Sequence, residues 1–227
     1  MIIESFIIFF IIFIILAIFY LRTVDEYRIN QIKWSDKKNI PKILWERVPI
    51  IIQNIPPITC WTKQDRQLRI QEYNRCQTPV EIGKVSGILH WCSKENLQAI
   101  FSYIIRPTST VCATGNMGLF QTKSEWTCII PTDEQIQVSL IKKSIGNNLP
   151  YNWKNRTIDS ITSVDTPFVA DIKFIDIIVK KGMLLLLPPH MYVEINTSNP
   201  DNGYCFIYFD SLFSYIVKYI GMGKAHS

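Results

Sequence analysis

The sequence predicts a mainly β domain with flanking helices, preceded by one N-terminal transmembrane helix. Two patterns predict this arrangement. An uncharged apolar run begins close to the N-terminus, and short apolar segments separated by turn-forming residues fill the last third of the chain. The chain has 227 residues, 48% of them hydrophobic, which is enough for one domain of ordinary size plus an appendage.

The N-terminal run has the length and composition of a membrane anchor. Residues 5–21 carry no charge, and residues 1–3 bring the run close to the roughly 20 residues that a bilayer requires. A cleavable signal peptide is the alternative, but no basic residue precedes the run and no small-x-small site follows it. We therefore expect a retained anchor over residues 1–21. Its lipid-facing side chains include Ile7, Phe9, Phe10, Ile14, Leu16 and Phe19.

The flanks of this run predict its orientation. Residues 22–40 are polar and charged and are expected to form a juxtamembrane linker, with Lys and Arg after the helix and none before it. Basic residues stay on the cytoplasmic side, so we expect a single-pass protein whose C-terminal domain faces the cytosol. In a luminal domain, the alternative, the sequons at Asn155 and Asn196 would be glycosylation acceptors and the cysteines could form three disulfides. The cysteines are Cys60, Cys76, Cys92, Cys112, Cys128 and Cys205.

The charge of the chain favours a membrane partner over a nucleic acid. The net charge is +5, and no Lys/Arg-rich block or aromatic platform suggests DNA or RNA binding. Basic residues beside an anchor attract anionic headgroups by about 1 kcal/mol each. We therefore expect the lipid bilayer as a partner, together with proteins held at the same membrane, and no nucleic acid.

Residues 41–227 are expected to form the domain. An apolar run bounded by prolines predicts a buried strand within residues 47–57, and residues 63–75 have the composition of an exposed helix. Residues 80–91 predict a strand, and a helix is expected to follow Ser93 as its N-cap. Its apolar face would hold Leu97, Ile100, Phe101, Ile104 and Ile105. Short apolar pieces over residues 111–160 predict further strands and loops.

The last third of the chain predicts four successive strands and a terminal helix. The strands are expected within residues 170–179, 183–187, 191–195 and 204–209, with turns at Lys180-Lys181-Gly182 and Pro188-Pro189. Residues 211–220 are expected to form a helix with one apolar face. That face would hold Leu212, Ile216, Tyr219 and Ile220. Strands this short with such turns predict an antiparallel sandwich or barrel.

The stretch "KKGMLLLLPPHMYVEI", residues 180–195, resembles a known family. Its Gly182, leucine run and Pro188-Pro189 are similar to the "G-D-x-L-x-I-P-P-x-W-W-H-x-V" strand of JmjC-type, cupin-like double-stranded β-helix proteins. Residues 46–57 resemble the opening strand of such domains. The resemblance is nearest to membrane-anchored cupin-like proteins of large DNA viruses, in which an "F-x-Y" strand, here Phe206 to Tyr208, precedes a terminal helix. It implies a cupin-like domain and a viral membrane or virion.

The residues that bind the metal in that family do not occur at the matching positions of this sequence. Active members hold iron with a His-x-Asp/Glu pair and a distant histidine, because Fe(II) needs three facial ligands. No histidine here is followed by such an acid, and Val193 stands where the distant histidine would be. Strand alternation places Val193 on the interior face and Glu194 on the outer one. We therefore expect no metal, cofactor or catalytic residue, with His190, His90 and Glu194 the weak candidates for an unorthodox site.

The sequence thus predicts a non-catalytic, membrane-anchored interaction or structural module. An Fe(II)/2-oxoglutarate-type oxygenase with rearranged ligands is one alternative. A small-ligand binder that uses the barrel lumen is another. The motifs of serine hydrolases, P-loop nucleotidases and zinc proteases do not occur in the chain.

Overall fold

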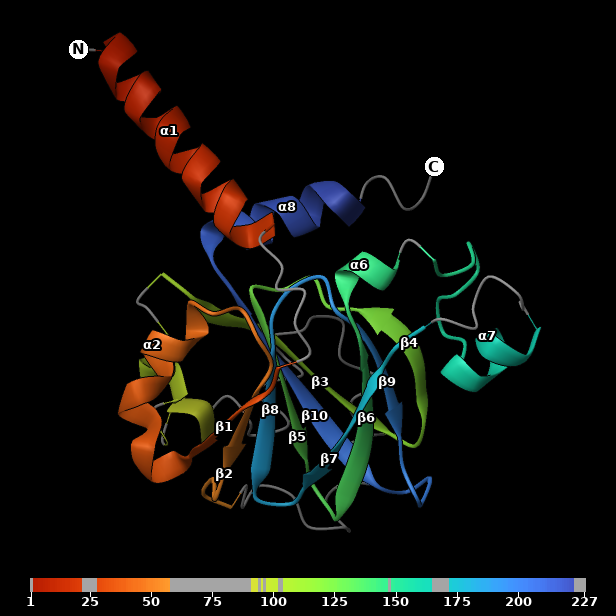
Figure 1. The fold of residues 1–227 in the computed structure, drawn as a ribbon. Coiled ribbons are helices and arrows are strands. Elements are labelled where there is room, and N and C mark those ends of the chain that lie inside the picture. The colour runs from red at the N-terminus through yellow and green to blue at the C-terminus, as the bar shows by residue number, and fades with distance from the viewer. Residues whose placement is uncertain are drawn as a thin grey trace, which may run out of the picture.

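A computed structural model shows two facing β-sheets with helices around them (Figure 1). It describes residues 2–21, 28–57, 91–93, 95, 97–101, 104–146, 148–164 and 172–222. The predicted helix at 63–75, all but the last residue of the predicted strand at 80–91, and His90 lie outside these residues. The prediction of a mainly β fold with flanking helices is confirmed.

The strands form one six-stranded and one four-stranded sheet. The orders are β1-β2-β8-β5-β10-β3 and β4-β9-β6-β7, and every pair is antiparallel except β1 with β2. From β3 to β10, consecutive strands pass from one sheet to the other, except that β6 and β7 are neighbours in the four-stranded sheet. This is a jelly-roll arrangement, which is consistent with a cupin-like β sandwich. The strands are β1 (Asn30–Lys33), β2 (Ile50–Gln53), β3 (Arg106–Thr114), β4 (Met117–Gln121), β5 (Trp126–Pro131), β6 (Gln135–Ile141), β7 (Ile175–Lys180), β8 (Met183–Leu187), β9 (Tyr192–Asn196) and β10 (Gly203–Asp210).

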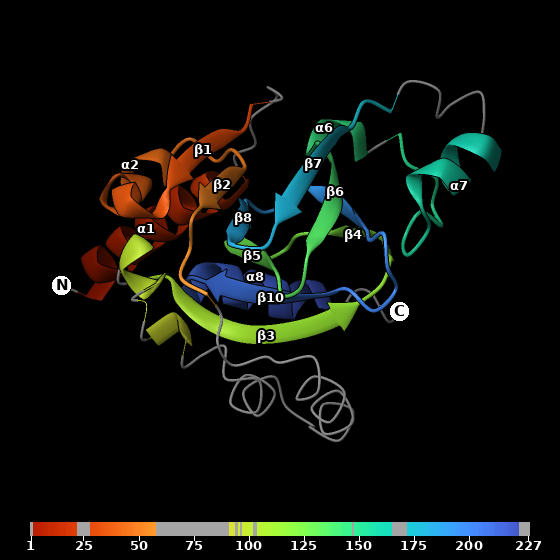
Figure 2. The same cartoon turned by 90° about the horizontal axis from the view of Figure 1, so that it is seen from below.

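Helices cover the outer faces and one end of the sandwich. In Figure 1, α1 projects from the sheets and α8 lies at its base, while Figure 2 shows the same molecule from below. The predicted strands in the last third of the chain and the terminal helix are all present. The helices are α1 (Ile2–Leu21), η1 (Trp34–Asn39), α2 (Ile40–Leu44), η2 (Leu97–Ile100), α6 (Lys143–Gly146), α7 (Ile158–Val164) and α8 (Leu212–Met222).

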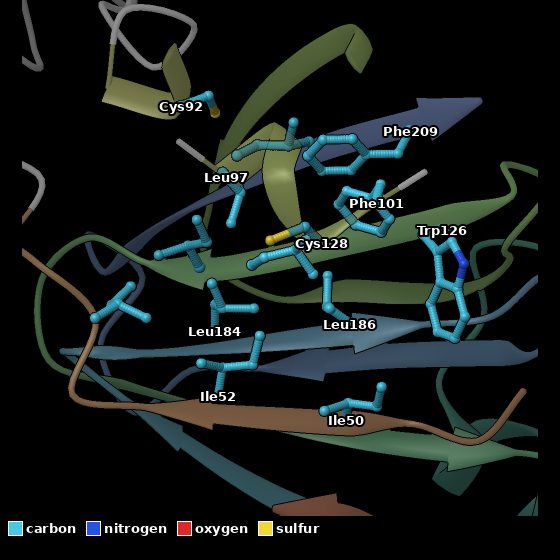
Figure 3. Packing of buried hydrophobic residues seen from close by; sticks show 14 of the residues in the cluster. Ile50, Ile52, Cys92, Leu97, Phe101, Trp126, Cys128, Leu184, Leu186 and Phe209 are labelled. Atoms are coloured by element: carbon cyan, nitrogen blue, oxygen red, sulfur yellow. The ribbon is translucent and has the colours of Figure 1, made fainter. Parts of the chain in front are cut away.

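The leucine run of β8 is buried on both faces of the six-stranded sheet. Leu184 and Leu186 share one cluster with residues of α2 and η2, and Figure 3 shows them on the side of the sheet that faces Leu97. Leu185 and Leu187 point between the two sheets. A strand buried on both faces has no need of polar alternation, which accounts for four successive leucines. The turn before this strand is made by Gly182, whose positive φ of 84° favours glycine.

The space between the sheets is filled by apolar side chains. Val193 and Ile195 are fully buried there, and Met191 packs against the same cluster, as strand alternation predicted. Each such side chain contributes on the order of 1.5–3 kcal/mol through burial. The buried members of this interior cluster are Ile51, Ile129, Ile136, Val138, Leu140, Ile177, Val179, Leu185, Leu187, Val193, Ile195, Tyr204 and Phe206.

The structure differs from the sequence-based expectation in two places. The predicted linker over residues 22–40 includes β1 and η1, because residues 30–33 pair in parallel with β2 and so belong to the domain. Of the helix predicted after Ser93, the structure describes the short 3₁₀ turn η2, while residues 94, 96, 102 and 103 lie outside the described part, and β3 begins at Arg106. Leu97, Ile100 and Phe101 are buried as expected, but Ile104 is 67% exposed.

Leu212 and Ile216 of the predicted apolar face of α8 point outward, and the side chains of Tyr219 and Ile220 lie outside the described part. Phe213 and Ser214 face inward, whereas Leu212 is 73% and Ile216 41% exposed. The inward face is set by contact with α1, because the Phe213 ring lies edge-on against that of Phe13, with 5.0 Å between centroids. Sequence periodicity cannot reveal a face that is chosen by a neighbouring helix.

Candidate functional site at the foot of α1

The last turn of α1 is fixed to the β domain, and we call this junction the foot of α1. Tyr20 is only 3% exposed, and its hydroxyl donates a hydrogen bond of 2.5 Å to the carbonyl of Lys123. Its ring also lies edge-on to those of His190, at 4.9 Å, and Phe213, at 5.8 Å. The apolar helix is therefore held by specific contacts on the domain surface.

Most of the described side chains of α1 other than Tyr20 are exposed. Among the side chains predicted to face lipid, Ile7, Phe9, Phe10, Ile14 and Leu16 are 40–67% exposed, and the Phe19 side chain lies outside the described part. Within the part of the chain that the structure describes, no helix is long and apolar enough to cross a membrane.

A pocket of about 380 Å³ lies between α1, α2 and the end of the six-stranded sheet. Its lining is mostly apolar, with a few polar groups, which is the composition of small-molecule and lipid sites. Leu16 of α1, Trp45 after α2 and Trp126 of β5 form part of the lining. Arg47, Glu125 and Ser211 supply its polar atoms.

Arg47 and Glu125 form a buried ion pair in this lining. Their side chains are 10% and 8% exposed, and a second guanidinium nitrogen of Arg47 donates to the Glu125 carbonyl at 3.3 Å. The guanidinium also lies 5.7 Å from the ring centre of Trp126. The two charges neutralise each other, so the pair fixes the chain after α2 against β5.

A second carboxylate, Asp210, joins β10 to the start of α8. It accepts hydrogen bonds from Thr108 at 2.6 Å and from Ser214 at 3.1 Å. Ser211 caps α8 by accepting from the Ser214 N–H at 3.1 Å, and its hydroxyl donates to Glu125 at 3.2 Å. This network orients α8 relative to the ion pair. These hydrogen bonds hold the start of α8 against β10 and Glu125.

His190, a predicted candidate ligand, lies beneath α1 and not in the lumen. It has a positive φ of 69°, and its backbone N–H donates to the Thr122 carbonyl at 2.7 Å. The Thr122 hydroxyl in turn donates to the carbonyl of Pro188 at 2.8 Å, which closes the β8–β9 turn. Burial, followed by the nearby charge of Lys143, lowers the pKa of His190 to about 4.

This pKa predicts a pH-dependent stability. The unfolded histidine titrates near 6.5, so between about pH 6.5 and 4 the unfolded chain binds a proton that the folded chain does not. The contribution of His190 to stability is therefore lost as pH falls through this window. His190→Asn, which tolerates a positive φ, should flatten the pH dependence of the urea midpoint between pH 7 and 4.5. Equal slopes for both proteins would contradict this account.

Glu194, the second candidate, lies on the outer face of β9, as alternation predicted. That face is not solvent-exposed, because the start of α7 covers it and the Glu194 carboxylate accepts from the Ile158 N–H at 2.8 Å. Burial raises the pKa of Glu194. Nothing in the local sequence of β9 signals this cover, which comes from a segment some 36 residues earlier.

The structure does not bring these candidates into a metal site. His190 contacts the foot of α1, whereas Glu194 contacts α7 and Asn196. No group of three His, Cys, Asp or Glu side chains suited to a metal occurs among residues with described positions. In the interior, Val193 lies opposite Phe120 of β4, and both belong to the apolar filling.

One cysteine bears on the disulfide alternative. Cys128 of β5 is a fully buried free thiol, and burial raises its pKa well above the usual range. Cys128 has no disulfide partner among the described residues, whereas Cys60, Cys76 and the Cys112 side chain lie outside them. A buried thiol of this kind is a small apolar core residue and not a nucleophile.

Sequence analysis did not identify the charged residues that lie beside the foot of α1. Arg47, Glu125 and Asp210 stand in three separate segments, and only the fold brings them together. The one local signal was Ser211 followed by Ser214, an N-cap pattern at the start of the predicted terminal helix.

Comparisons with known proteins add little to this geometry. No protein-family model matches the chain, and no curated protein matches it. Among solved structures, hydroquinone 1,2-dioxygenase from Sphingomonas sp. TTNP3, with 4-hydroxybenzoate bound, has a TM-score of 0.32 and 16% sequence identity. The match covers 50% of this chain and 64% of that one, so the chain spans under two thirds of its neighbour. A likeness this weak carries no argument, and the cupin-like β sandwich rests on strand order.

Proposed function

We propose that the protein is a non-catalytic, membrane-anchored module in which α1 holds a cupin-like domain at a lipid bilayer. The docking of α1 on the domain carries the proposal. The buried Tyr20 fixes the helix, while the side chains farther up, such as Phe9 and Ile12, contact water in the isolated chain. Exposed apolar surface of this extent marks a membrane or protein interface.

The interior of the domain supports a binding or structural role over catalysis. Phe206 and Val193 are among the apolar side chains that occupy the space where related folds hold a metal or ligand. Among the candidate ligands of the oxygenase alternative, His190 and Glu194 face different elements, and His90 lies outside the described residues. An anchor raises the effective concentration of the domain against other membrane-held proteins, which fits a protein that works through contacts.

The orientation and setting of the module are part of the proposal. Basic residues follow α1 and none precede it, which supports a single-pass protein with its domain in the cytosol. The resemblance of residues 180–195 to cupin-like proteins of large DNA viruses supports a viral membrane or virion.

The anchoring role is tested by placing charges on α1 without touching the domain. Phe9 is 67% and Ile12 50% exposed, and each aspartate at the centre of a membrane helix costs about 2.5–3.5 kcal/mol. In vesicle flotation, we expect the Phe9→Asp/Ile12→Asp variant to be absent from the floating lipid fraction. The control variant Phe9→Leu/Ile12→Leu should float with the vesicles, as the wild type does. Flotation of the aspartate variant at the wild-type level would refute the role of α1.

A further inference from the structure

Exposed apolar side chains gather around the foot of α1. Outside α1, the described residues include eight large apolar side chains that are exposed, and five of them lie on the segments bordering this helix. The other three are Tyr151, Phe174 and Ile178. The five are Trp45, Ile104, Leu212, Tyr215 and Ile216.

α8 presents three of these side chains in one direction. Phe213 and Ser214 pack inward, so Leu212, Tyr215 and Ile216 point away from the domain, at 41–73% exposure. In Figure 1, α8 lies across the end of the sandwich from which α1 projects. A helix with one apolar face outward and parallel to a surface is the geometry of an interfacial membrane helix.

Only the outer part of α1 extends beyond the domain. Phe213 contacts both Phe13 and Tyr20, so residues 13–20 of α1 run alongside the domain and only residues 2–12 extend beyond it. Those eleven residues rise about 16 Å, roughly half of a hydrocarbon core of about 30 Å. Insertion of these residues therefore brings the foot of α1 to the surface of the bilayer.

The surroundings of the foot suit a lipid surface. Trp45, 65% exposed, lines the pocket with Leu16 of α1, and tryptophan is enriched at membrane interfaces. Lys123 is exposed, and its backbone carbonyl accepts the hydrogen bond from Tyr20. Lys143 lies near enough to His190, beneath the helix, for its charge to lower the pKa of that histidine. Two lysines beside an apolar surface complement anionic headgroups.

We propose that the outward face of α8, with Trp45 and Ile104, is a membrane-contact surface that lies in the interfacial region of a phospholipid bilayer beside α1. The inference rests on the proposed anchoring by α1. The domain is thereby held flat against the bilayer and does not swing on a flexible tether.

The test places a photo-cross-linker on α8 in the full chain. Tyr215 is replaced by p-benzoylphenylalanine, and the protein is reconstituted in phosphatidylcholine vesicles containing phosphatidylserine. Ile178, 56% exposed, is the matched control because its strand β7 lies away from α1 in Figure 1, and Phe9 of α1 is the positive control. We expect lipid adducts from the probes at Tyr215 and Phe9 and none from Ile178. Adding Leu212→Asp/Ile216→Asp should abolish only the adduct at Tyr215.

The outcomes separate the inference from the proposed function. An adduct at Phe9 without one at Tyr215 would overturn the membrane contact of α8 and leave anchoring by α1 intact. Adducts of equal yield at Tyr215 and Ile178 would also overturn it, because contact would not be specific to α8. No adduct at any position would overturn anchoring itself.

Discussion

Glu125→Ala is expected to lower the free energy of unfolding by about 3–5 kcal/mol, because it leaves the buried Arg47 guanidinium without its carboxylate. The remaining hydrogen bond from Arg47 to the backbone carbonyl of residue 125, at 3.3 Å, cannot neutralise the charge. Ser211 also loses its acceptor, which loosens the start of α8. Urea denaturation followed by tryptophan fluorescence measures the change.

Two comparisons give this prediction its specificity. Arg28→Ala removes a surface pair with Glu46, in which the side chains are 58% and 41% exposed, and should cost at most about 1 kcal/mol. The double variant Arg47→Met/Glu125→Met removes both charges and should recover part of the stability that Glu125→Ala loses. A loss no larger for Glu125→Ala than for Arg28→Ala would show that the ion pair is not buried.

Phe206→Ala is expected to cost about 3–5 kcal/mol, because the side chain fills the space between the two sheets. Its ring lies edge-on to those of Phe120, at 5.6 Å, and Tyr204, at 5.5 Å, and stacks on Tyr208. The void left behind would be apolar, and such cavities take up small apolar molecules. Benzene should therefore raise the urea midpoint of Phe206→Ala more than that of the wild type.

Phe206→Leu is the matched control for the filled interior. It keeps an apolar side chain of intermediate volume and should lose distinctly less stability than the alanine variant. If Phe206→Ala unfolded at the wild-type midpoint, the interior would not be packed. The small-ligand alternative that uses the lumen would then regain support.

The late strands could be predicted because their signals are local. Gly182 and Pro188 mark the ends of β8, and the leucines between them already indicate a strand buried on both faces. β1 escaped prediction because its "NQIK" sequence is mostly polar and its half-buried alternation becomes meaningful only beside β2. A four-residue segment does not carry enough pattern to predict that it pairs in parallel at the edge of a sheet.

The candidate site shows where sequence reasoning ends. Alternation correctly assigned Val193 to the interior and Glu194 to the outer face, but it could not foresee that α7 buries Glu194. Likewise, the periodicity of α8 favoured Leu212 and Ile216 as a packing face, whereas contact with α1 selected Phe213. When a segment far away in the sequence covers one face of a helix or strand, the buried face depends on the topology of the fold. The residue pattern of the element itself does not predict it.

Alkaline carbonate extraction of membranes from cells that express the full chain tests the central claim most directly. The claim is that α1, fixed to the domain through Tyr20, inserts into the bilayer as an anchor. Peripheral proteins are released by this wash, whereas proteins held by a buried apolar helix are retained. The account predicts that the wild-type chain stays in the membrane pellet. Release of the wild-type chain into the supernatant would contradict it.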